Sequence, residues 1–229
     1  MENVIQQAEA EAAPQAAPES DSVRGQKTED FLAALASERA TPGGGTAAAA
    51  AAAAGAALVA MVARLTAGKK EYASAEERMR GIVGEADEGR DALLGLADRD
   101  ADAFDGVMAA FRLPKETDQE KAARSAAIER SLAWAAQVPL EVARRAVSLM
   151  DLAREVTANG VATAASDGAT AGYILSAATE GALANVLINL GSMKDPDQSS
   201  AIRAEANALQ EQSRKLLAAT SAAFRERIS

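Results

Sequence analysis

The chain has 229 residues, contains neither cysteine nor histidine, and carries a net charge of −9 at pH 7. The lack of cysteine excludes disulfides and thiolate metal ligands, and the lack of histidine excludes imidazole ligands and histidine-dependent catalytic triads. The acidic balance argues against binding to nucleic acid, which requires a basic face. Carboxylates, lysines, tyrosines, hydroxyl groups and the backbone are left for any chemistry.

The composition predicts a single all-α domain. Hydrophobic residues make up 48% of the chain but aromatic residues only 3%. Long stretches rich in Ala, Leu, Glu and Arg, without strand alternation, predict an alanine-rich, close-packed bundle of six to eight helices. Helices with so few bulky side chains must approach each other closely, and such small-residue faces also suit a subunit interface, so we expect a homodimer.

The first 26 residues are predicted to form a disordered acidic leader, and residues 27–229 the helical domain. Residues 1–22 hold five acidic and no basic side chains, and they lack the basic and apolar regions of a secretory signal. Residues 47–63 are uncharged, but this stretch is short for a membrane span and mostly alanine. We therefore expect a cytoplasmic protein that does not bind membranes.

A glycine-rich turn is the first prominent motif. Residues 41–46 read TPGGGT, and they stand between a short helix expected to begin near Thr28 and eight consecutive alanines. The turn should lead into the N-terminus of an alanine helix that ends near Thr66, where free N–H groups and the helix dipole suit an anionic or polar ligand. Its glycine spacing is not that of a nucleotide-binding motif.

Further helices follow in order along the chain. Apolar residues at helical spacing predict a helix over 72–111, and Thr117 with Glu120 predicts a capping box that opens the next one. Pro139 should kink that helix. Glycines punctuate further helical segments, and a charged amphipathic helix should finish the chain over 199–227.

Two groups of charged residues are candidates for chemistry. Asp100 shares a helix face with Phe104, and a carboxylate beside an aromatic ring can have a raised pKa and act as a general base. The alternative is a solvated surface acid. Lys69, Lys70 and Tyr72 form a potential cationic lip for an acidic ligand, or else the lysines only complement a helix dipole.

Two polar pairs lie later in the chain. Ser166 and Asp167 precede a glycine and are either site residues or part of a helix cap. Asn185 and Asn189 are four residues apart in an apolar segment, so both carboxamides share one helix face. Buried carboxamides need polar partners, which another helix or a heterocyclic ligand would provide.

Taken together, these segments resemble the cyclodeaminase/cyclohydrolase family, which includes the C-terminal domain of formiminotransferase-cyclodeaminase and stand-alone methenyltetrahydrofolate cyclohydrolases. The resemblance covers residues 28–225 and depends on seven motifs in order. They are Thr41-Pro42-Gly43-Gly44-Gly45-Thr46, Leu65-Thr66-x-Gly68-Lys69-Lys70, Asp100-x-x-Ala103-Phe104, Leu113-Pro114-Lys115, Val138-Pro139-Leu140, Ser166-Asp167 and Asn185-Val186-x-x-Asn189.

The resemblance implies an all-helical homodimer that binds a tetrahydrofolate derivative in a cleft, without a metal or redox cofactor. It implies catalytic roles for Asp100, Asp167 and Lys69. The implied substrate-binding residues are Pro42, Gly43, Gly44, Gly45, Lys70, Tyr72, Phe104, Ser166, Asn185 and Asn189.

Three functions follow from this resemblance. The first is hydrolysis of 5,10-methenyltetrahydrofolate to 10-formyltetrahydrofolate. The second is cyclodeamination of formimidoyltetrahydrofolate with release of ammonia. The third is a non-catalytic helical dimer that binds folate or a protein.

Overall fold

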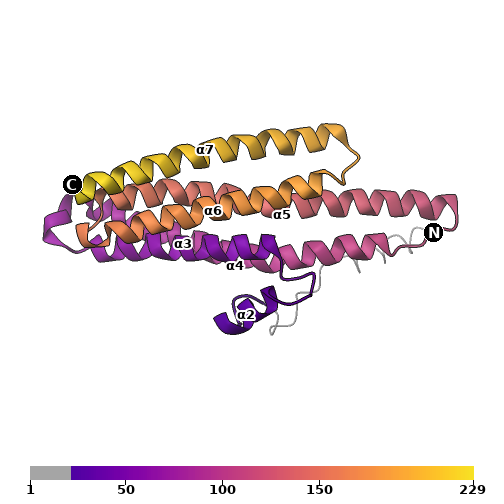
Figure 1. Cartoon of the computed structure of the whole chain (residues 1–229), viewed down its shortest axis with the longest axis horizontal. Helices are drawn as coiled ribbons and strands as arrows, with labels where there is room; N and C mark the ends of the chain where they lie inside the picture. The colour runs from indigo at the N-terminus through magenta and orange to yellow at the C-terminus, as the bar shows by residue number, and fades with distance from the viewer. Residues whose placement is uncertain (1–21) are drawn as a thin grey trace.

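The computed structural model describes residues 22–229, and within this range it is an all-α domain without strands. Six α-helices run nearly parallel or antiparallel, except for the first one, α2 (Figure 1). Their bounds are Thr28–Leu35 (α2), Gly44–Thr66 (α3), Glu76–Phe111 (α4), Asp118–Asn159 (α5), Ala165–Leu190 (α6) and Pro196–Ile228 (α7). Two 3-10 helices, Lys70–Ala75 (η1) and Ala162–Ala164 (η2), precede α4 and α6. The all-α prediction is therefore confirmed.

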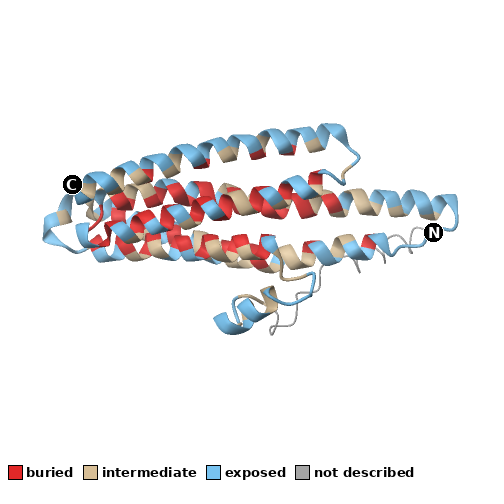
Figure 2. Cartoon of the chain, viewed as in Figure 1, coloured by how far each residue is buried: buried red, intermediate tan, exposed pale blue. Residues whose placement is uncertain are grey.

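Small residues let the central helices approach closely. α3 packs against α4 and α6, and α5 packs against α6 and α4, so the buried residues gather where these helices meet (Figure 2). A Cβ added at Gly55 of α3 would lie 2.7 Å from Leu175 Cγ of α6. One added at Gly168 would lie 2.6 Å from Thr157 Oγ1 of α5. The predicted close-packed, alanine-rich bundle is present.

The helix ends follow the local sequence in most places. The hydroxyl of Thr117 accepts the Glu120 N–H and the Glu120 carboxylate accepts the Thr117 N–H, so the predicted capping box is present. The first helix begins at Thr28, as expected, and Lys27 occupies the N-cap position. Pro139 lies inside a continuous α5 and does not end that helix.

Residues 22–26 of the predicted leader are tied to α4, and residues 1–21 lie outside the described part of the chain. The carboxylate of Asp98 accepts the Ser22 hydroxyl at 2.9 Å and the Val23 N–H at 2.8 Å. α2 has no buried residue, and it lies beside the bundle rather than within it (Figure 1). At one end, the hairpin of α4 and α5 extends beyond α3 and α6 and is largely exposed (Figure 2).

Two described segments are long and apolar enough to cross a membrane. They are Gly44–Thr66 and Ala162–Leu190, with mean hydropathies of 1.9 and 1.3. In each, half or more of the most apolar stretch is buried inside the bundle, 61% and 50% respectively. Core helices of soluble proteins have the same length and composition, so these two segments are weak evidence of a membrane span.

Candidate functional site

The N-terminus of α3 receives a carboxylate from α4. Gly43 immediately precedes the helix, and Gly44 and Gly45 form its first turn. The Thr46 hydroxyl donates to Asp100 Oδ2 at 2.9 Å. A Cβ added at Gly45 would overlap the Asp100 carboxyl group and lie 2.6 Å from its Cγ. The anion expected at this helix end is therefore the protein's own Asp100. Its carboxyl group occupies the space that a side chain at position 45 would fill.

Burial sets the acidity of Asp100. Removal from water raises the pKa of the Asp100 carboxyl, and hydrogen bonds from the side chain and backbone of Thr46 oppose this rise. The net effect is a pKa above the usual range for aspartate. A carboxylate with a raised pKa is a better proton acceptor, because general-base catalysis is favoured as the pKa approaches the working pH.

A cleft of about 340 Å³ opens beside Asp100. Among the residues that line it, Asp100 alone carries a charge. The others are Ala40, Thr41, Gly43, Gly44, Gly45, Ala103, Phe104, Val107, Phe111, Leu132, Ala135, Asn185, Ile188, Asn189 and Ser192. A mostly apolar cleft with a few convergent polar groups is typical of a small-molecule site, and this one has a single negative charge in its lining.

The two asparagines predicted from their spacing both line this cleft. Asn185 Nδ2 donates to the Gly181 carbonyl at 2.9 Å within α6, and Asn189 Nδ2 donates to the Ala135 carbonyl of α5 at 2.8 Å. Each carboxamide is therefore held by one backbone partner. Its Oδ1 accepts no hydrogen bond from residues 22–229 and is free to accept one from a ligand.

The second group of predicted residues lies at the opposite end of α3. Lys69 and Lys70 follow its C-terminus and are exposed. Because α3 has 23 residues, its two ends are about 33 Å apart at 1.5 Å per residue. Within one chain, these lysines therefore do not reach the cleft that contains Asp100.

Tyr72, Ser166 and Asp167 belong to this second end. The Tyr72 hydroxyl accepts the Ala162 N–H at 3.1 Å, which links the segment after α3 to the one before α6. This hydrogen bond, with one from Arg227, lowers the pKa of Tyr72 below its usual range. Ser166 and Asp167 lie in the first turn of α6, and neither is its N-cap.

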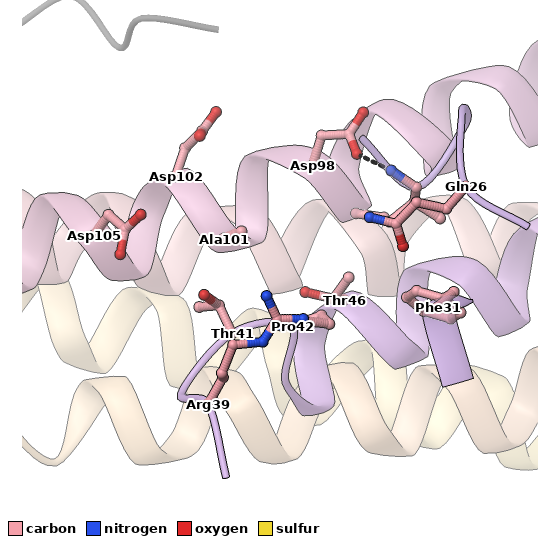
Figure 3. Close-up of a pocket in the computed structure, with 12 residues that line it drawn as sticks. Gln26, Phe31, Arg39, Thr41, Pro42, Thr46, Asp98, Ala101, Asp102 and Asp105 are labelled. Carbon is pink, nitrogen blue, oxygen red and sulfur yellow. Dashed lines mark hydrogen bonds between the residues drawn. The ribbon is translucent and has the colours of Figure 1, made fainter. Parts of the chain in front are cut away.

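A smaller pocket of about 140 Å³ lies next to the cleft and shares Thr41 with it. Figure 3 shows the loop that carries Thr41 and Pro42 on one side of this pocket and the acidic face of α4 on the other. That face carries Asp98, Asp102 and Asp105, as their helical spacing predicts. Pro42, predicted to bind substrate, lines this pocket and not the cleft.

The structure adds residues that the sequence did not single out. Thr46 is buried and donates a hydrogen bond to Asp100, and its place directly after the three glycines is the signal that could have identified it. Val107 and Phe111 extend the wall that Phe104 begins, at intervals of three and four residues. Helical periodicity would have found these two, whereas Leu132 and Ile188 come from other helices and are brought to the cleft only by packing.

Comparison with known proteins shows the family of this chain. Residues 27–208 match the formiminotransferase-cyclodeaminase family. A methenyltetrahydrofolate cyclohydrolase from Methylorubrum extorquens is 40% identical over 167 residues, which are 73% of this chain and 80% of that protein. A formimidoyltransferase-cyclodeaminase from Sus scrofa is 33% identical over 86% of this chain but only 36% of its own length.

A solved structure has the same fold. It is a formiminotetrahydrofolate cyclodeaminase from Thermotoga maritima, with a TM-score of 0.82 and 28% sequence identity. The similarity covers 90% of this chain and all of that one. The sequence motifs, the helical bundle and these relatives agree, and the chain belongs to the formiminotransferase-cyclodeaminase family.

Proposed function

We propose that this protein hydrolyses 5,10-methenyltetrahydrofolate to 10-formyltetrahydrofolate. The observation that carries the proposal is Asp100, the single charge in the cleft, which is partly withdrawn from water and oriented by Thr46. The substrate carries a delocalised positive charge on an amidinium carbon, so a lone carboxylate is its electrostatic complement. The 40% identity to a methenyltetrahydrofolate cyclohydrolase supports the same reaction.

Asp100 acts as the proton acceptor and then the proton donor. Water adds to the amidinium carbon between N5 and N10, and the carboxylate takes one proton from the attacking water. The resulting carbinolamine is neutral. The N5–carbon bond then breaks as N5 receives a proton from Asp100, and loss of the hydroxyl proton forms the formyl group on N10. One proton is released to solvent for each water consumed.

The test follows the absorbance of methenyltetrahydrofolate with the purified chain, after subtraction of the spontaneous rate. Wild-type protein should accelerate the loss, and Asp100→Asn should lower kcat by about 100-fold or more, as expected for a general base. Asp98→Asn is a matched control, because Asp98 lies on the same helix and lines the smaller pocket instead. Wild-type protein that does not exceed the spontaneous rate would overturn the proposal.

Cyclodeamination of formimidoyltetrahydrofolate is the second candidate. It is favoured by the solved structure of a formiminotetrahydrofolate cyclodeaminase with the same fold. Here N10 attacks the formimidoyl carbon, and a carboxylate would transfer protons so that the nitrogen leaves as ammonia. Ammonia release from formimidoyltetrahydrofolate, without hydrolysis of methenyltetrahydrofolate, would favour this activity. If the wild-type protein binds folate but accelerates neither reaction, it is a non-catalytic binder.

We also propose that two chains associate through the uncovered side of α3 and α6. The exposed or half-buried residues there are apolar over most of both helices, including Ala54, Ala57, Leu65, Tyr173 and Ala177. Ala57→Glu should convert a dimer to a monomer in light scattering after size exclusion. Ala208→Glu, at an exposed alanine of α7, should leave the mass unchanged.

Such a dimer would give the residues near the C-terminus of α3 a role in the cleft of the partner subunit. A two-fold axis perpendicular to α3 places the end of one α3 beside the start of its partner's. Lys69, Lys70, Tyr72, Ser166 and Asp167 would then complete the cleft of the other subunit. This arrangement accounts for the separation of about 33 Å within one chain.

We propose that the reaction needs no metal or redox cofactor and takes place in the cytoplasm. The chain has no histidine or cysteine, and residues 22–229 contain no cluster of three or more acidic side chains suited to a metal ion. Turnover should persist after dialysis against a chelator, and loss of activity that added metal restores would contradict this proposal.

A further inference from the structure

One face of α4 forms a wall of the cleft. Asp100, Phe104, Val107 and Phe111 follow at intervals of four, three and four residues, and all four line the cleft. The first and the last are eleven positions apart, which is about 16 Å along the helix at 1.5 Å per residue. The wall therefore runs from a carboxylate, over apolar side chains, to an aromatic ring near the end of α4.

A cation lies beside that last ring. The guanidinium of Arg124, from α5, is 5.8 Å from the centroid of the Phe111 ring. Its Nε and one terminal nitrogen donate to the Phe111 carbonyl at 3.3 and 3.0 Å. The half-buried Arg124 side chain is thus fixed at the end of α4 by a ring and a carbonyl group.

The positive charge of Arg124 has no acidic partner in the described part of the chain. None of the ion pairs among residues 22–229 includes it. A guanidinium has five N–H groups in a planar fork that matches a carboxylate. Its two hydrogen bonds to Phe111 leave most of that fork available.

We propose that Arg124 binds a glutamate carboxylate of the folate substrate. This inference rests on the proposed function, because the substrate has matching polarity. Going outward from its pterin, it has a cationic carbon, then an aromatic aminobenzoyl group, and carboxylates at the far end. Asp100 receives the cation, Phe104 and Val107 pack against the ring, and Arg124 receives the carboxylate. Arg124 is a binding residue in this arrangement and takes no part in proton transfer.

Lys69 and Lys70 are the competing carboxylate ligands. They lie beyond the far end of α3 and reach the cleft only if a second subunit supplies them. Arg124 belongs to the same chain as Asp100 and contacts a residue that lines the cleft. The two alternatives therefore differ in which substitution should abolish recognition of the glutamate, one at Arg124 or one at Lys69 or Lys70.

The experiment compares two substrates, methenyltetrahydrofolate and methenyltetrahydropteroate, which lacks the glutamate. Arg124→Gln should raise KM for the first by about ten- to a hundredfold, the range expected for loss of a hydrogen bond to a charged group. It should leave kcat unchanged, and KM for the second substrate should not move. Arg130→Gln, an exposed arginine on the same helix, should change neither KM.

A shift of equal size for both substrates would overturn the inference, because it would mean that Arg124 only stabilises the hairpin. A glutamate-selective shift in Lys69→Gln or Lys70→Gln, and not in Arg124→Gln, would also overturn it. If wild-type protein hydrolyses neither substrate, the proposed function fails first. Calorimetric titration with p-aminobenzoylglutamate and p-aminobenzoate then decides, since only the glutamyl compound should lose affinity in Arg124→Gln.

Discussion

The side chain of Asn189 donates to the carbonyl of Ala135, at 2.8 Å from α6 to α5. In an uninterrupted helix that carbonyl would accept the N–H of the residue four positions later. That residue is Pro139, which has no N–H, and α5 nevertheless continues through it. Asn189 thus supplies the donor that proline removes, and the same bond fixes its side chain at the wall of the cleft.

Removal of the Asn189 donor should destabilise the protein most when proline occupies position 139. Asn189→Ala leaves a carbonyl without its partner, and we expect a loss of about 1–3 kcal/mol in the free energy of unfolding. In a Pro139→Ala background the backbone provides an N–H, so the same substitution should cost less. Urea denaturation of the four proteins in this double-mutant cycle measures the difference.

Asn185→Ala is the matched control for this cycle, because Asn185 donates to a carbonyl of its own helix that also has a regular backbone donor available. Its cost should be small and independent of residue 139. Strictly additive effects of Asn189→Ala and Pro139→Ala would contradict the interpretation.

Activity should require the space that Gly45, which has no side chain, leaves for the Asp100 carboxyl group. Gly45→Ala places a Cβ on the Asp100 carboxyl group, so the carboxylate must move and activity should be lost. Overpacking of this kind costs about 1–3 kcal/mol of stability. Gly84→Ala in α4 meets no atom within 4 Å and should be neutral or stabilising by about 0.5–1 kcal/mol. Full activity of Gly45→Ala would show that the position of Asp100 is not critical.

Local sequence predicted the helices and two pairs of residues that share one cleft, but not the distance between the two groups of candidate residues. Spacing alone placed Asp100 with Phe104, and Asn185 with Asn189, and both pairs line one cleft. The resemblance groups Lys69 and Asp167 with Asp100, and residue spacing gives no information on the distance between the two ends of a helix. Thr46 and Ile188 were missed because their roles arise from contacts between helices.

Removal of the Thr46 hydroxyl should shift the pH dependence of turnover. Thr46 donates to the charged form of Asp100 and holds its pKa down against the effect of burial. Thr46→Val removes one donor with little change in shape, so the pKa of Asp100 should rise further. The acid limb of the kcat/KM profile should then move to higher pH. Thr179→Val should leave the profile unchanged, because among residues 22–229 the Thr179 hydroxyl donates only to the Leu175 carbonyl.

Asp100→Asn should be inactive and yet more stable than wild type at neutral pH. Because burial raises the pKa of Asp100 in the folded protein above the 3.8 that is usual for aspartate, the folded state binds more protons over the interval between the two pKa values. Wild-type stability therefore falls as pH rises through this interval and stays lower above it. The amide has no such loss. The difference in Tm should grow from pH 3 to pH 7, and a constant difference would contradict the assignment.

Subunit mixing should reveal whether the two ends of α3 meet in a dimer. If the cleft of one subunit is completed by the partner's Lys69, then Asp100→Asn and Lys69→Ala are each inactive as homodimers. Each mixed dimer has one intact site, because the unmutated Asp100 of one subunit faces the unmutated lysine of the other. Random mixing of equal amounts should restore about one quarter of wild-type activity. No recovery of activity would mean that both residues act in the site of the same subunit, an arrangement that the length of α3 argues against. A fully active Lys69→Ala variant would show that Lys69 is not part of the site.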